Sequence, residues 1–236
     1  MKTMKLLMIL ILCVPIIAFS QLEKPKWDYP IKPGSQEWKT FKSSEEMVNA
    51  CQIPDHILNS ISTGYLLDLC LKYPMFLDIH FSDNLQDGLD IIIPSFNGFV
   101  ELFNRKDCQA VLMDLYFKET PCDVELKKNN NTLKLFYLEL LISQDKIITK
   151  LDNNQKKNLL KESLKKINSK IIKNHSQYYE LSSALILGRL INSFDIKNKI
   201  TSDLLLDRFS DKGILIDSLN IFKIINISQE YLRDHE

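Results

Sequence analysis

Residues 62–80 read STGYLLDLCLKYPMFLDIH, the most apolar stretch of the chain once its first residues are set aside. Ser62 is a suitable helix N-cap, Leu66 and Cys70 lie at helical spacing, and Pro74 predicts where the helix stops. Lysine, proline and aspartate interrupt the stretch, so it is too short to span a membrane. Apolar residues on more than one side of this helix instead predict a segment nearly surrounded by protein.

Most of the remaining chain shows apolar residues at helical spacing, with breaks at proline, glycine and asparagine. The run Ser43 to Glu46 (SSEE) predicts a capping box, with Ser43 as N-cap and Glu46 reaching back, at the start of a helix that ends before Pro54. The strand-like alternation of residues is weak throughout. The sequence therefore predicts an all-α fold, either a compact multi-helix bundle or an irregular antiparallel helix stack. Further helices are expected at 55–60, 84–93, 97–104, 107–118, 133–151, 155–173, 177–193 (the central one), 201–210 and 214–233.

The expected organisation follows the changes in composition along the chain. A signal peptide (1–20) precedes an extended, Pro/Trp-rich N-terminal arm (21–42) whose aromatic residues predict contact with the body of the protein. A first helical region (43–120) is separated by a loop or linker (121–132) from a second helical region (133–236). The two regions form either one domain or two, because the roughly 215 residues left after cleavage can build either.

The first residues, MKTMKLLMILILCVPIIAFSQ, match a secretory signal. Two lysines precede an uncharged apolar run, and small residues at Ala18 and Ser20 favour cleavage before Gln21. Two alternatives are a membrane anchor formed by an uncleaved signal and lipid attachment at Cys13, although the preceding Leu12 is not the small residue that lipid attachment prefers. We expect an exported protein of the periplasm or the extracellular space.

The composition is that of a folded, electrically balanced protein. Hydrophobic residues make up 45% and charged residues 25% of the chain, with 30 Lys+Arg against 30 Asp+Glu. No overall field attracts nucleic acid, so no nucleic-acid partner is expected.

Export leaves four cysteines in an oxidising compartment, which permits two disulfides. Cys51 lies near the end of one predicted helix and Cys70 inside the next but one, and Cys108 and Cys122 flank a short helix, so both pairs are candidate bridges. The alternative is a set of buried free thiols, which behave as small hydrophobic side chains. The spacing of the cysteines does not match a zinc site, and no metal is expected.

The sequence assigns no catalytic residue. Asp78, His80 and Asp83 lie within six residues and could begin a metal site or orient a general base, but they fit equally a polar edge at the end of a core helix. All six glycines are isolated, so there is no phosphate-binding loop, and no nucleophile or HExxH motif occurs. No cofactor is expected.

The predicted helix 155–173 is rich in lysine. Its lysines could form a basic face that docks on an anionic membrane, or simply a solvated helix surface. They are Lys156, Lys157, Lys161, Lys165, Lys166, Lys170 and Lys173.

Four segments within about residues 28–118 carry a resemblance to other proteins: KPGSQEWKTF, MVNACQIPDHIL, STGYLLDLCLKYP and FNGFVELFNRKD. They resemble an uncharacterised family of exported bacterial proteins that share an N-terminal helical region. The resemblance implies bacterial export and a helical module that begins at the Trp/Pro segment. It implies no activity.

These observations favour a non-enzymatic binding module whose partner is an envelope or extracellular protein. One alternative is an enzyme acting on envelope polymers through carboxylates such as Asp78, Asp83, Asp87 or Asp90. Another is a protein that binds membrane surfaces through the lysine-rich helix. The oligomeric state and the identity of the ligand do not follow from the sequence.

Overall fold

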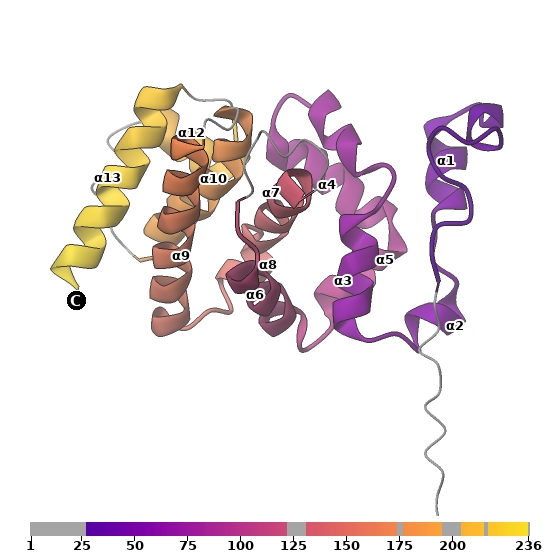
Figure 1. The fold of residues 1–236 in the computed structure, drawn as a ribbon, viewed down its shortest axis with the longest axis horizontal. Helices are drawn as coiled ribbons and strands as arrows, with labels where there is room; N and C mark the ends of the chain where they lie inside the picture. The colour runs from indigo at the N-terminus through magenta and orange to yellow at the C-terminus, as the bar shows by residue number, and fades with distance from the viewer. Residues whose placement is uncertain (1–26, 122–130, 174–176, 195–203, 215–216, 236) are drawn as a thin grey trace, which may run out of the picture.

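The computed structural model of the protein describes residues 27–121, 131–173, 177–194, 204–214 and 217–235. Within these ranges the chain forms helices and no strand, which confirms the predicted all-α fold. Figure 1 shows the helices packed side by side, from α1 near the N-terminal end of the described chain to α13 at the opposite end. The predicted signal peptide (1–20) lies outside the described residues.

The elements follow one another with short connections. The α-helices are α1 (Ser44–Ala50), α2 (Asp55–Leu58), α3 (Thr63–Leu71), α4 (Leu85–Ser95), α5 (Asn97–Asn104), α6 (Cys108–Lys118), α7 (Asn131–Ile142), α8 (Asp145–Ile148), α9 (Asn153–Ile172), α10 (Gln177–Ser193), α12 (Leu204–Lys212) and α13 (Ser218–Asp234). The 3-10 helices are η1 (Trp38–Thr40) and η2 (Phe76–Phe81).

Side-chain caps begin several of these helices where the sequence predicts them. The Ser62 hydroxyl accepts a hydrogen bond from the backbone N–H of Tyr65 at 3.3 Å, so α3 starts at the predicted cap. Ser43 caps α1 in the same way, but the carboxylate of Glu46 reaches one residue further back than predicted. It accepts from the backbone N–H of Lys42 at 2.7 Å.

Several helix boundaries differ from the prediction by a few residues, and two of the differences have a clear local cause. The helix expected over 133–151 is divided into α7 and α8, because Gln144 adopts an extended backbone. The side chains of Ser143 and Gln144 both donate to the Leu140 carbonyl, at 2.8 and 2.9 Å. These bonds replace the backbone hydrogen bond that the Leu140 carbonyl would accept if the helix continued. Helix α4 also continues through Pro94 to Ser95, since a proline in the last turn removes only one backbone donor.

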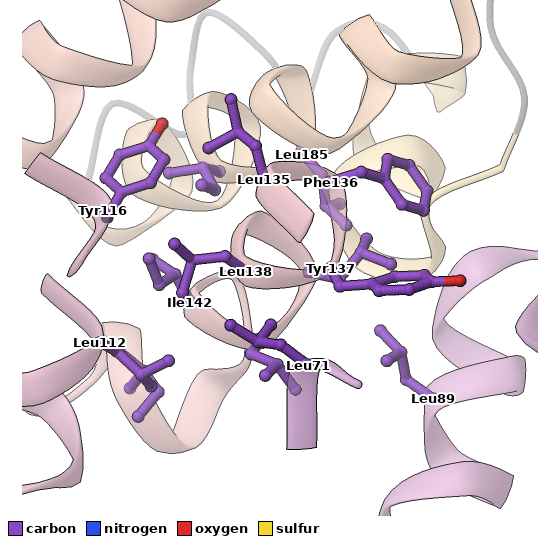
Figure 2. Packing of buried hydrophobic residues seen from close by; sticks show 14 of the residues in the cluster. Leu71, Leu89, Leu112, Tyr116, Leu135, Phe136, Tyr137, Leu138, Ile142 and Leu185 are labelled. Carbon is purple, nitrogen blue, oxygen red and sulfur yellow. The ribbon is translucent and has the colours of Figure 1, made fainter. Parts of the chain in front are cut away.

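A single hydrophobic cluster contains residues from both predicted helical regions. Leu66, Leu69 and Cys70 of the apolar stretch are buried in it, so this stretch forms core, as predicted. Helix α10 packs against α7, α9, α12 and α13, which confirms its central place. Figure 2 shows α7 contributing Leu135, Phe136, Tyr137, Leu138 and Ile142 to the cluster, with Leu185 of α10 behind them.

The described part of the N-terminal arm begins at Trp27 and contacts α3. The buried Tyr29 hydroxyl donates to the Leu69 carbonyl at 2.8 Å, and the Tyr65 hydroxyl donates to the Trp27 carbonyl at 2.5 Å. These bonds attach the start of the arm to the core, as its aromatic residues predict. The following turn and η1 are largely exposed.

Candidate binding groove

A groove of about 510 Å³ is lined by α4, α5 and the start of α8, and Arg189 of α10 and the last turn of α12 complete its lining. Its apolar wall comes from α4 and α5. Leu89 and Ile93 are one turn apart in α4, and Val100 and Phe103 are one turn apart in α5, so each pair faces the same side of its helix. Val100 is 44% exposed, which leaves apolar surface open to a ligand.

Arg189 of α10 forms the floor of the groove and joins three elements. Its Nε donates to the Ser210 carbonyl at 2.9 Å, and Nη1 donates to the Ser143 carbonyl at 2.7 Å. Nη2 donates to Gln86 Oε1 at 2.7 Å and to the Asp211 carbonyl at 2.8 Å. One guanidinium thus supplies donors to the carbonyl ends of α7 and α12, which have no donors within their own helices.

Among the described residues, hydrogen bonds to uncharged oxygens hold the Arg189 guanidinium, rather than an ion pair. Burial lowers the pKa of Arg189 below its ordinary value, while the negative charges of Asp145, Asp211 and Asp90 act in the opposite direction. Arginine remains charged under such conditions. Since every guanidinium nitrogen already donates to an oxygen of the protein, we assign Arg189 a positioning role in the groove.

Three exposed carboxylates lie on the rim, those of Asp90, Asp145 and Asp211. Asp90 accepts a hydrogen bond from the Gln86 amide at 2.7 Å, and Gln86 is also bonded to the amide of Gln144. None of the three carboxylates forms an ion pair with another residue in the described part of the chain. The rim therefore offers hydrogen-bond acceptors and negative charge.

The two lysines of the groove are engaged within the protein. The Lys212 ammonium lies 3.4 Å from Asp87. The Lys146 ammonium lies over the ring of Phe103, 5.7 Å from its centroid, in the geometry of a cation–π contact. The aromatic wall of the groove thus already carries a cation of the protein itself.

A close approach of two helices places α12 at the groove. A Cβ atom added at Gly188 would lie 2.5 Å from Ser210 Oγ, nearer than real contacts allow. Glycine at 188 therefore lets α12 approach α10 closely enough for Arg189 to reach the Ser210 and Asp211 carbonyls.

A second polar cluster is fully buried between α7, α9 and α10. The Glu139 carboxylate accepts from the Lys170 ammonium at 2.5 Å, from Ser183 Oγ at 2.6 Å and from Ser182 Oγ. The Lys170 ammonium also donates to the Tyr179 carbonyl at 2.8 Å and to Ser183 Oγ at 2.9 Å. Every oxygen and proton of this ion pair has a partner.

Serine, lysine and carboxylate side chains of this kind can support nucleophilic chemistry, but none of these residues lines any of the five described cavities. Burial lowers the pKa of Lys170, and the charge of Glu139 opposes that shift. The arrangement supports a structural role. The sequence does contain one indication of this buried cluster, because Glu139 is a single charged residue flanked by Leu138 and Leu140.

The candidates Asp78 and His80 lie on η2, and Asp83 lies in the exposed turn that follows. Partial burial raises the pKa of Asp78 and lowers that of His80. The His80 ring lies 6.0 Å from the ring of Phe136. None of the three residues lines one of the five described cavities, and of the four suggested carboxylates only Asp90 reaches the groove.

Cys51, Cys70 and Cys108 are buried free thiols. The structure therefore does not contain the candidate Cys51–Cys70 disulfide, and the alternative of buried small side chains describes these residues. Burial raises the pKa of Cys51 and Cys108 to about 11, so their unreactive thiol forms are favoured at neutral pH. Cys122, the second member of the other candidate pair, lies outside the described residues.

The predicted basic face of α9 is not continuous. Lys166 and Lys170 are buried and turned into the protein, and the Lys166 ammonium donates to Glu162 at 2.8 Å and to the Glu119 carbonyl. Of the seven lysines, Lys161 and Lys165 are exposed and the other three are half-buried. The prediction of one solvated lysine face is therefore wrong for the two buried residues, because it did not anticipate their partners in other segments.

The described residues contain no group of three or more histidine, cysteine or acidic residues able to hold a metal ion, and no helix among them is long and apolar enough to cross a bilayer. No family model matches the chain, and neither a curated protein nor a solved structure matches it.

Proposed function

We propose that this protein is a non-enzymatic binding module that acts after export, and that its groove holds an apolar side chain and an adjacent basic side chain of a partner polypeptide. The observation that supports this proposal is the juxtaposition of the apolar wall formed by Val100 and Phe103 with the carboxylates of Asp90, Asp145 and Asp211. Binding sites commonly combine an apolar surface with a few polar groups that fix orientation.

The charged groups of the groove favour a ligand with a positive charge. Arg189 has no N–H group left to offer, and Lys212 is paired with Asp87. The three rim carboxylates form no ion pair within the described residues and are exposed, so a cationic group of a ligand could pair with them. The Lys146 ammonium already lies over the Phe103 ring, which is only 6% exposed, so we expect a ligand cation at the rim carboxylates instead.

A titration followed by NMR tests the groove. We expect acetyl-Leu-Arg-Gly amide to shift the resonances of α4, α5 and α8 with a Kd on the order of 1 mM, which is about −4 kcal/mol. The variant Asp90→Asn/Asp145→Asn should weaken binding about tenfold, because each neutralised rim charge removes up to about 1 kcal/mol. Glu45→Gln, an exposed change on α1, is the matched control.

Equal shifts with acetyl-Leu-Glu-Gly amide, or shifts with the arginine peptide that avoid the groove, would contradict the proposal.

Export is tested separately at the N-terminus. We expect the full chain, expressed in a bacterial host with a periplasm, to be recovered from the periplasmic or extracellular fraction with Gln21 as its first residue. Intact-mass measurement distinguishes this product from an uncleaved or lipid-modified chain. Replacing Ile9 and Ile11 by arginine should abolish both export and cleavage, because two charges interrupt the apolar run. Recovery of the unprocessed chain in the cytoplasm would contradict the proposal of export.

A further inference from the structure

A second cavity of about 450 Å³ adjoins the groove, and the two share Asp145, Arg189 and Asp211 as lining residues. The cavities are therefore neighbours across one guanidinium. The two adjoining cavities, called the trough below, are lined by α4 and α5 at the first end and by α8, α10 and α12 at the second, with the three shared residues between them.

The two ends of the trough differ in chemistry. The first end has the apolar wall, whereas the lining of the second is mainly polar and includes Thr149, Ser193 and Asp207. The side-chain oxygen of Asn192, which also lines this end, is buried and has no hydrogen-bond partner within the described part of the chain. An unpaired buried oxygen costs free energy, which a donor brought by a ligand could recover after a small side-chain rotation.

Charge at the second end also favours a donor. Its lining carries the carboxylates of Asp145, Asp207 and Asp211, and Asp207 forms no ion pair with another described residue. The positive charges in this lining belong to Arg208 and Arg189, and the Arg189 guanidinium already donates to oxygens of the protein. A second basic side chain complements this end.

We propose that the ligand is an extended polypeptide segment that crosses Arg189, with an apolar–basic pair in the groove and a second basic side chain in the adjoining polar cavity. This inference rests on the proposed function and adds to it the length and pattern of the segment. A cavity of about 500 Å³ is roughly 10 Å across, the length of about three extended residues. The second basic residue should therefore follow the first by about three positions.

The test compares two peptides by NMR titration or calorimetry. We expect acetyl-Leu-Arg-Gly-Ser-Arg-Gly amide, or the peptide with this order reversed, to bind at least tenfold more tightly than acetyl-Leu-Arg-Gly amide. Asp207→Lys, which changes only the second end, should remove that gain and leave the tripeptide affinity unchanged. Thr149→Lys, also at an exposed residue of the second end, provides an independent variant should the change in α12 disturb the fold.

Asp90→Lys, which changes only the first end, should weaken both peptides, and Glu45→Lys carries the same change of charge on distant α1 as a control. A hexapeptide that binds no tighter than the tripeptide, or a gain that survives both Asp207→Lys and Thr149→Lys, would overturn the two-ended trough and leave the proposed groove intact. If neither peptide binds, the proposed function and this inference both fail.

Discussion

Replacing Glu139 by glutamine is expected to destabilise the protein by about 3–5 kcal/mol at pH 7, the largest effect of any single change considered. The carboxylate is fully buried and accepts from Lys170, Ser182 and Ser183. Glutamine has nearly the same shape as glutamate but carries no negative charge. Its amide N–H group would face the Lys170, Ser182 and Ser183 donors and could not accept from them. The Lys170 ammonium is then left buried without a counter-charge. Urea unfolding followed by circular dichroism measures the loss.

The pH dependence of Glu139→Gln separates this cause from a general packing defect. Burial already lowers the pKa of Lys170 in the folded protein, and removal of the Glu139 charge should lower it further. Between that lowered pKa and the ordinary value of 10.5, the unfolded chain binds more protons than the folded chain. The free energy of unfolding of the variant should therefore rise as the pH is raised through this window.

The double variant Glu139→Leu/Lys170→Met provides the control, because replacing both charges removes the uncompensated ion. It should be more stable at pH 7 than Glu139→Gln, although the hydroxyls of Ser182 and Ser183 would lose an acceptor. A Glu139→Gln variant as stable as the parent chain at pH 7, or equally destabilised at every pH, would show that the ion pair does not carry this part of the stability.

Helix boundaries could be predicted from the sequence where residues next to the boundary end the helix. Helix α5 spans 97–104 as expected, because its boundaries are set by neighbouring residues. The break between α7 and α8 was not predictable in this way, since no glycine or proline marks it. It depends on Ser143 and Gln144, and on Arg189, which donates to the Ser143 carbonyl from 46 positions away in the chain.

The groove was harder to predict from the sequence than the fold was. Its members come from five separate segments, and the hydrogen bond between Gln86 and Arg189 joins residues 103 positions apart. No local motif links them, so only Asp90 among the predicted carboxylates was found to line it. Lys170 was misassigned for a related reason: among neighbouring lysines nothing local distinguishes the one whose partner lies in α7.

Replacing Arg189 by methionine is expected to destabilise the protein by about 2–4 kcal/mol and to loosen α12 specifically. The carbonyls of Ser143, Ser210 and Asp211 would lose a charged donor, and such hydrogen bonds contribute about 1.5–3 kcal/mol each, partly recovered where water can enter the groove. Arg189→Lys should lose nearly as much, because a single ammonium cannot span two helix ends.

Native-state hydrogen exchange combined with urea unfolding distinguishes this local effect from a global one. In Arg189→Met, amide protection should fall in α12 well before it falls in α9, which packs against α10 independently of the guanidinium. Arg105→Met is the matched control, since Arg105 donates to the Leu58 and Ile61 carbonyls near α2 and pairs with Glu101 of α5, away from Arg189. Its loss of protection should fall on α2 and the end of α5 and leave α12 unchanged. Should α12 in Arg189→Met stay as protected as in the parent chain, its other contacts must hold its last turn, among them the close approach of Gly188 to Ser210 and the Lys212–Asp87 ion pair, and the groove would then keep its shape without its arginine floor.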